Sequence, residues 1–168
     1  MGQGMRMGII VRRVATVALM VLLLGLGGFV RGNEVDQNTA APAQVFREWL
    51  PAALAGDAAA QYELGHAYAD GAVTVEDMAE AAHWYRQAAN RGSIRAQRDL
   101  AILYNKGLGV PQDYVQAYVW FDLAAVRFGT GRRHDQAAEM RDMMAAFLTP
   151  EQLSEAKRRS EELQAKSE

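Results

Sequence analysis

The side chains that could carry out chemistry are few in this chain, and they are widely spaced. Its 168 residues include no cysteine and only three histidines, His66, His83 and His134. No two histidines are four residues apart, so the His-Glu-x-x-His spacing of a zinc protease helix is absent. Without cysteine the chain forms no disulfide, no thiolate zinc site and no thiol nucleophile. We expect no metal site and no cofactor.

Glycine and serine are equally weak candidates for an active site. The segment 107–109 (GLG) lacks the third glycine of a phosphate-binding loop and follows a predicted helix instead of a strand. Ser93 is better explained as a helix N-cap than as a nucleophile. Neither Ser154 nor Ser160 lies in the strand-turn-helix context of a hydrolase serine. We therefore predict a protein without catalytic residues, not an enzyme.

The composition is that of a folded domain. Half of the residues are apolar and 23% are charged, with 15 glycines and 4 prolines, which is unlike a disordered chain. The net charge is −2 and there is no long basic run, so the chain lacks the charge pattern of a nucleic-acid-binding protein.

The N-terminus resembles an export segment. Arg6, Arg12 and Arg13 precede an uncharged, mostly apolar stretch from Val14 to Val30. This length is just above that of a signal-peptide core and at the short limit of a membrane-spanning helix. We interpret residues 1–32 as a signal peptide or an N-terminal membrane anchor, and both alternatives remain open. Either one predicts export, to the periplasm or to the periplasmic side of the inner membrane.

The segment 33–43 (NEVDQNTAAPA) has small and polar residues without periodicity, as is typical of a linker. The three arginines before it are the only charges in residues 1–30, so the net charge without them is −5. That balance disfavours binding to anionic membranes. We therefore expect membrane contact only through the N-terminal segment.

The body of the chain is a repeat with an offset of 36 residues. Small, aromatic and acidic residues recur at this offset. The matching pairs are Ala60/Ala96, Gln61/Gln97, Leu64/Leu100, Tyr68/Tyr104, Gly71/Gly107, Asp77/Asp113, Ala81/Ala117, Trp84/Trp120, Tyr85/Phe121, Ala88/Ala124 and Ala89/Ala125. Their spacings of three and four predict two helices in each unit, which we call the A and B helices.

Each predicted helix has start and stop signals. Asp57 and Ser93 precede the A helices as N-caps, and the B helices begin near Asp77 and Asp113. Glycines end all four helices, where the chain needs a left-handed residue: Gly71, Gly92, Gly107 and Gly129. Small residues let the helices approach closely while Trp84 and Trp120 fill the core.

The segments LGHAYADG…EDMAEAAHWYRQAANRG and LAILYNKGLGVPQDYVQAYVWFDLAAVRFG resemble the Sel-one-like repeat (SLR) family, relatives of the tetratricopeptide repeats. The second unit carries the family's Gly107, Gly109, Val110 and Asp113. The first has Val73-Thr74 in place of Gly-Val, and the second has Ala101 in place of an A-helix glycine. The resemblance implies an all-α fold, a short right-handed α-solenoid of antiparallel helix pairs.

Repeat 1 is then assigned to residues 57–92 and repeat 2 to residues 93–129. Residues 44–56, with Trp49, are expected to form an N-terminal capping helix broken at Pro51. Residues 130–168 are expected to form a degenerate third helix pair and C-terminal cap.

The third pair is predicted as a helix over 134–148 and a last helix to about Lys166. Thr149 begins the second of these through a capping box. Two inward-facing sets and one charged set complete this expectation. Ala137, Met140, Met144 and Phe147 form the stripe of the first helix, Leu153, Ala156, Ser160 and Leu163 face inward on the second, and Lys157, Arg158 and Arg159 form its solvated face.

A surface on the A helices remains as the candidate functional site. Leu64 and Tyr68 face inward, so the neighbouring stripe is expected to be exposed and to bind a partner. Its residues are Tyr62, His66, Ala69 and Asp70 in repeat 1, and Arg98, Ile102, Asn105 and Lys106 in repeat 2. Tyrosine and arginine are common interface anchors. The alternative is that Tyr62 only covers a neighbour and Arg98 is solvated.

These observations favour a non-catalytic protein-protein interaction module of the cell envelope, which binds another protein or peptide through its concave face. Two alternatives belong to other classes: an envelope hydrolase such as a β-lactamase-like SLR protein, and a structural subunit that self-assembles. The hydrolase requires a polar catalytic cluster, which the sequence does not show. The structural subunit requires concentration-dependent oligomers.

Overall fold

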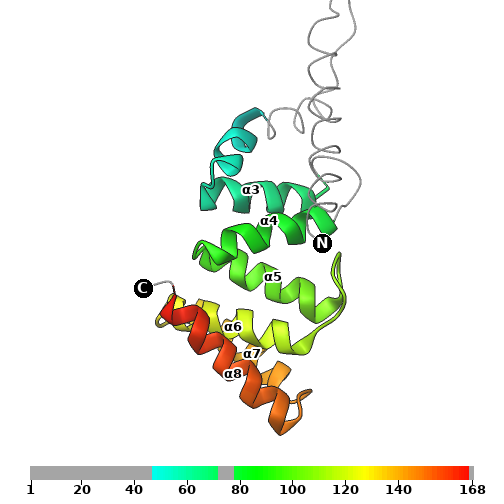
Figure 1. Cartoon of the computed structure of the whole chain (residues 1–168), viewed down its shortest axis with the longest axis vertical. Helices are drawn as coiled ribbons and strands as arrows, with labels where there is room; N and C mark the ends of the chain where they lie inside the picture. The colour runs from blue at the N-terminus through cyan, green and yellow to red at the C-terminus, as the bar shows by residue number, and fades with distance from the viewer. Residues whose placement is uncertain (1–46, 72–77, 167–168) are drawn as a thin grey trace, which may run out of the picture. The chain divides into compact units, whose positions relative to one another are not determined.

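The computed structural model describes residues 47–71 and 78–166, which form helices and no strand (Figure 1). A short helix at residues 47–54 precedes six longer ones. These are α3 (Ala58–Ala69), α4 (Met78–Asn90), α5 (Ile94–Lys106), α6 (Tyr114–Phe128), α7 (Arg132–Ala145) and α8 (Pro150–Ala165). All of them belong to one compact unit, residues 44–168. The predicted all-α solenoid is confirmed.

The expected export segment and linker, residues 1–43, lie outside the described residues. Within the part of the chain that the structure describes, no helix combines the length and the apolarity needed to cross a membrane.

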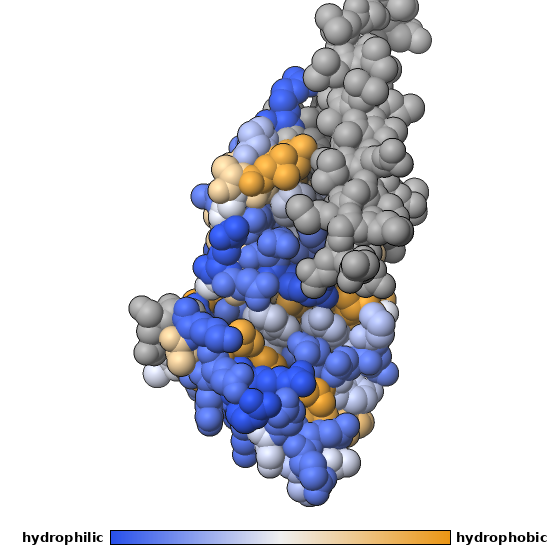
Figure 2. Space-filling view, viewed as in Figure 1, coloured by the Kyte–Doolittle hydropathy of each residue, from blue (hydrophilic) through white to orange (hydrophobic). Residues whose placement is uncertain are grey.

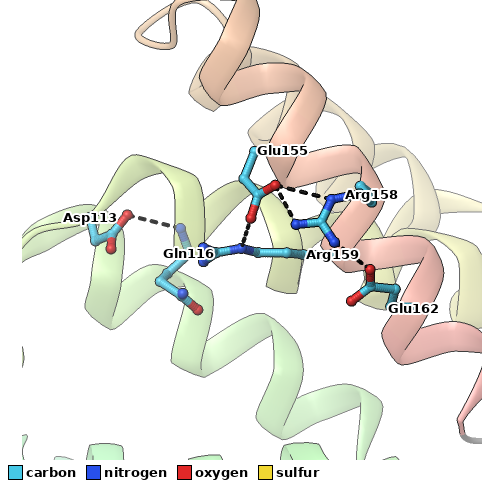
Figure 3. Close-up of polar contacts among 6 residues, drawn as sticks. All are labelled: Asp113, Gln116, Glu155, Arg158, Arg159 and Glu162. Atoms are coloured by element: carbon cyan, nitrogen blue, oxygen red, sulfur yellow. Dashed lines mark hydrogen bonds and ion pairs between the residues drawn. The ribbon is translucent and has the colours of Figure 1, made fainter.

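The helix boundaries follow the predicted capping residues. The side chain of Asp57 accepts a hydrogen bond from the backbone N–H of Ala60 (2.7 Å), and Ser93 caps α5 in the same way. Asp113 accepts from the N–H of Gln116 (3.0 Å; Figure 3). Each cap satisfies a backbone donor that has no partner within its own helix. The expected cap at Asp77 lies outside the described residues.

The core lies between the A and B helices, and the repeated aromatic and small residues fill it. Trp84 and Trp120 are buried, as predicted, with 5% and 6% exposure. Leu64, Leu100 and Phe121 are completely buried. Within each unit the two helices pack against each other, α3 against α4 and α5 against α6. Because α4 also packs against α5, the core runs continuously from one unit to the next.

Gly65 marks the closest approach between α3 and α4. A Cβ atom added at this glycine would lie 2.5 Å from Cδ1 of Tyr85, so the ring leaves no room for a methyl group. In repeat 2 the corresponding position is Ala101, which is fully buried. The departure from the family pattern at Ala101 therefore changes a helix contact and leaves the fold intact.

A hydrogen bond that recurs along the chain joins each B helix to the A helix that follows it. Nε2 of Gln97 donates to the carbonyl of Ala89 at 3.2 Å, and Nε2 of Gln61 donates to the carbonyl of Ala53 at 3.0 Å. Nδ1 of His134 lies 2.9 Å from the carbonyl of Ala125. The three acceptors are 36 residues apart, so residues 47–54 occupy the place of a B helix before repeat 1.

Pro51 does not break this first helix, contrary to the expectation from sequence. Residues 47–54 are all helical, and the carbonyl of Pro51 accepts from the N–H of Ala55 at 3.1 Å. As a proline, Pro51 forgoes only its own N–H donor, and its carbonyl remains an acceptor within the helix.

The third helix pair begins with α7, which runs from Arg132 to Ala145, shorter at its C-terminal end than expected. Ala137 and Met144 are buried, but the prediction for Phe147 is wrong, because this residue follows the helix and is 61% exposed. Its ring instead stacks on Tyr114, with ring centroids 4.7 Å apart.

The last helix, α8, begins with the predicted capping box of Thr149 and Gln152. It buries Ala156 and Ser160 and packs mainly against α6. The carboxylate of Asp122 on α6 holds both neighbours: it accepts from Oγ of Ser160 (2.5 Å) and pairs with Arg141 of α7 (3.1 Å). Asp122 thus joins the last three helices.

Candidate functional site

The stripe predicted on α3 is only partly exposed. His66 and Asp70 lie at the surface, with Nδ1 of His66 2.9 Å from Oδ2 of Asp70. Tyr62 is buried, with 8% exposure, so the expectation that it is exposed is wrong. Its ring stacks on Tyr85 of α4 with centroids 5.7 Å apart, which is the covering role that the sequence left as the alternative.

Tyr62 also connects the two repeats. Its hydroxyl donates to Oδ2 of Asp99 on α5 at 3.1 Å, and the other carboxylate oxygen accepts from Nε of Arg98 at 2.7 Å. Burial, helped by the charge of Asp99, raises the pKa of Tyr62 to about 12. Burial also raises the pKa of Tyr85. Both phenols are therefore held in the protonated form, and the phenol of Tyr62 donates to Asp99.

This shift predicts a loss of stability at alkaline pH. Below pH 10 the phenol is protonated in both the folded and the unfolded chain, so its contribution is fully present. As the pH rises from 10 towards about 12, the unfolded chain loses the proton first and the free energy of unfolding falls. The free energy of unfolding can be measured in urea between about pH 8 and 11, in steps of about half a pH unit. It should decline less steeply with pH in Tyr62→Phe than in the wild type. Parallel curves for the two proteins would contradict the raised pKa.

The stripe predicted on α5 has mixed exposure. Lys106 is exposed, whereas Arg98 and Asn105 are half-buried. Ile102 packs against the core, and the backbone carbonyl of Asn105 accepts from the side chain of Gln112 at 2.7 Å. These residues lie along α5 between Arg98 and Lys106.

A pocket of about 500 Å³ lies at the other end of the A helices. It brings together α3, the N-terminal ends of α5 and α7, and the C-terminal end of α6. Its lining residues are Ala59, Tyr62, Glu63, Ser93, Ile94, Arg95, Arg127, Phe128 and Arg133. Tyr62 is the one residue of the predicted stripe that lines it.

The floor of this pocket is apolar and its edge is basic. Ile94 and Phe128 are half-buried and pack on the small alanine cluster between α6 and α7. Arg95 lies with Cζ 6.0 Å from the centroid of the Tyr62 ring. With Arg127 and Arg133 the pocket has three guanidinium groups and one carboxylate, Glu63.

The repeat pattern does not single out these arginines, although the sequence carries one signal of them. Arg95 and Arg133 are each the second residue of their helices, α5 and α7. A cation at a helix N-terminus opposes the helix dipole, so an arginine there is unexpected on grounds of folding alone.

A second basic cluster, on α8, has a different character. Arg158 pairs with Glu155 and Glu162, and Arg159 pairs with Glu155, all at 2.5–2.6 Å (Figure 3). The cluster is exposed, as expected, and its charges are paired within the helix. Figure 2 shows that the face of the molecule on which α8 lies is mainly hydrophilic. These side chains form a solvated face.

The described residues offer no metal site. Among residues 47–71 and 78–166, no three histidine, aspartate or glutamate side chains lie close enough together to hold an ion.

The stack of paired helices with an open, basic-edged pocket places the protein among the α-solenoid repeat proteins. Residues 58–93 and 94–125 match the Sel1 repeat. The chain therefore carries two Sel1-like repeats, over residues 58–125.

Two crystal structures are similar to this chain. One is c5321, a protective antigen of uropathogenic Escherichia coli strains with an SLR fold, at 31% identity and a TM-score of 0.64. The match covers 89% of this chain and 29% of that one. The other is a Sel1 repeat protein from Oxalobacter formigenes, at 25% identity and a TM-score of 0.53, covering 76% of this chain and 51% of the other. The chain thus spans less than a third of the first protein's length and about half of the second's. Comparison with curated proteins gives no match.

Proposed function

We propose that this protein is a non-catalytic interaction module that binds a partner protein on the face formed by α3, α5 and α7. The pocket at the N-terminal ends of α5 and α7 is the observation that carries this proposal. It crosses two repeats and part of the third helix pair, and its volume of about 500 Å³ is in the range of binding pockets. It also exposes arginine beside an aromatic floor, a combination common at interfaces.

The repeat architecture supports the same function. Helix pairs stacked side by side present a continuous surface built from successive A helices, and repeat proteins use such surfaces to bind other proteins. The bonds from Gln61 and Gln97 to the preceding helices hold these A helices in register. The surface is thereby fixed before a partner arrives, which reduces the entropic cost of binding.

Site-specific photocrosslinking in the cell tests this function. A photoreactive amino acid replaces Ala59, which lines the pocket, and in a second chain it replaces Lys157, which is exposed on α8. We expect a discrete crosslinked partner from position 59 and none from position 157. The same adducts from both positions, or adducts only from α8, would contradict the assignment of the face.

We further propose that the module acts in the cell envelope, exported through its N-terminal segment. The support is the order of Arg6, Arg12 and Arg13 before the uncharged stretch from Val14 to Val30. The intact mass of the protein in envelope fractions distinguishes a cleaved signal peptide from an uncleaved membrane anchor. A soluble species shorter by roughly 30 residues indicates a cleaved signal, and a full-length membrane species indicates an anchor. A full-length species in the cytosol alone would contradict export.

A further inference from the structure

We propose that the pocket between α3, α5 and α7 binds a short acidic segment of the partner protein, with carboxylates on the arginines and an apolar side chain on the floor. This inference rests on the proposed interaction function and specifies the chemistry of the partner. It is based on the charge of the pocket arginines, on their placement at helix ends and on the size of the pocket.

Two of the pocket arginines have no carboxylate partner in the part of the chain that the structure describes. Within the described residues, neither Arg95 nor Arg133 is within ion-pair distance of an aspartate or glutamate, although Glu63 lines the same pocket. The arginines of α8, by contrast, are paired along their own helix. Among the described residues, no carboxylate thus neutralises the charge of Arg95 or Arg133.

The placement of these arginines disfavours a purely structural role. Each is the second residue of its helix, where the positive end of the helix dipole repels a cation. The same helix ends attract an anion. A carboxylate bound between Arg95 and Arg133 would relieve this repulsion and gain charge-assisted hydrogen bonds.

The third arginine is held in place by the adjoining turn. Nη1 of Arg127 lies 2.8 Å from the position that a Cβ atom on Gly92 would occupy, so this guanidinium lies against the turn before α5. Arg91 lies in the same way against Gly56, one repeat earlier, with Nη2 at 3.1 Å. Arg127 thus lines the pocket with its guanidinium against this turn, and the proposal rests on Arg95 and Arg133.

The size of the pocket and the charge of the whole chain select a peptide over a polyanion. The volume of about 500 Å³ accommodates a few side chains, and Ile94, Phe128 and the Tyr62 ring provide an apolar floor for one of them. The chain as a whole has a net charge of −2, so a long polyanion would meet repulsion outside this pocket.

Selection from a random peptide library on the immobilised full chain, in non-ionic detergent, tests the proposal. We expect the selected peptides to be rich in aspartate and glutamate around an apolar residue. Their affinity should fall by about tenfold in Arg95→Gln and in Arg133→Gln, and it should fall as salt increases. Arg158→Gln, the matched control on α8, should bind as the wild type does.

A stability measurement guards against a folding artefact. Because the two arginines oppose the helix dipoles, each glutamine variant should unfold at the same temperature as the wild type or up to about 3 °C higher. A lower unfolding temperature would show that the arginines are structural and would overturn the proposal.

Other outcomes also decide the matter. The selected peptides could lack acidic residues and yet fail to bind a variant substituted at Ala59. That result would overturn the acidic specificity, but it would support the proposed binding face. If the chain bound vesicles with anionic lipid through these arginines, the occupant of the pocket would be a membrane and the proposal would be wrong. If the arginines were needed for dimers of the chain, the occupant would be a second copy, and the proposal would again be wrong. No selected peptide at all would contradict both this inference and the proposed function.

Discussion

Replacing Gly109 with alanine should destabilise the protein by about 3 kcal/mol or more, since the variant combines backbone strain with overpacking. Gly109 has a φ of 68°, in the left-handed region. A Cβ atom added there would lie 2.1 Å from the backbone carbonyl carbon of Met78, at the start of α4. Backbone atoms cannot turn aside as a side chain can, so the loop between α5 and α6 must move away from repeat 1.

The matched control for this variant is Gly107→Ala in the same loop. Gly107 has the same φ of 68°, but its added Cβ would lie 3.3 Å from the Cβ of Gln112, a contact that a small shift relieves. We expect it to cost about 1–2 kcal/mol, the left-handed strain alone. Chemical unfolding of both variants gives the comparison. Equal losses would show that the loop does not contact α4 as closely as the structure has it.

The second large effect is expected at Asp122. Asp122→Ala leaves Arg141 without its half-buried partner and Ser160, which is fully buried, without its acceptor. Removing one partner of such a network costs about 2–4 kcal/mol, because the remaining polar groups are left unsatisfied. The loss should appear first in α7 and α8, as faster hydrogen exchange of their amides.

Asp142→Ala is the control for Asp122→Ala, because both aspartates pair with the same arginine. Asp142 is 67% exposed in its side chain and lies 2.8 Å from Arg141. An exposed pair of this kind contributes about 0–1 kcal/mol. If the two variants were equally stable, Asp122 would not be the residue that joins the last three helices.

The parts of the fold that sequence predicted are those determined by local signals. The caps at Asp57, Ser93 and Asp113 depend on residues three positions away, and the core positions of Trp84 and Trp120 follow from helical spacing. The expected helix break at Pro51 was wrong, because the free-energy cost of a proline depends on its position within the helix. The spacing of Trp49 and Leu50 does not define that position.

The candidate site was harder to predict because it depends on contacts between helices. Tyr62 lies on the exposed side of α3 by periodicity, and it is the ring of Tyr85 and the carboxylate of Asp99 that bury it. The pocket assembles the ends of three helices, so Arg95 and Arg133 become neighbours of one cavity only through the stacking of the repeats. Their unfavourable position in α5 and α7 was the one local sign of a function.

The footprint of a captured partner on this protein tests the central claim most directly. Hydrogen–deuterium exchange, measured on the full chain alone and with the partner crosslinked from position 59, reports which amides the partner protects. We expect protection of residues 58–63, 93–98 and 131–134, at the pocket, and none at residues 155–162 of α8. Protection confined to α8 or to residues 47–54 would contradict this expectation and would place the binding surface elsewhere on the solenoid.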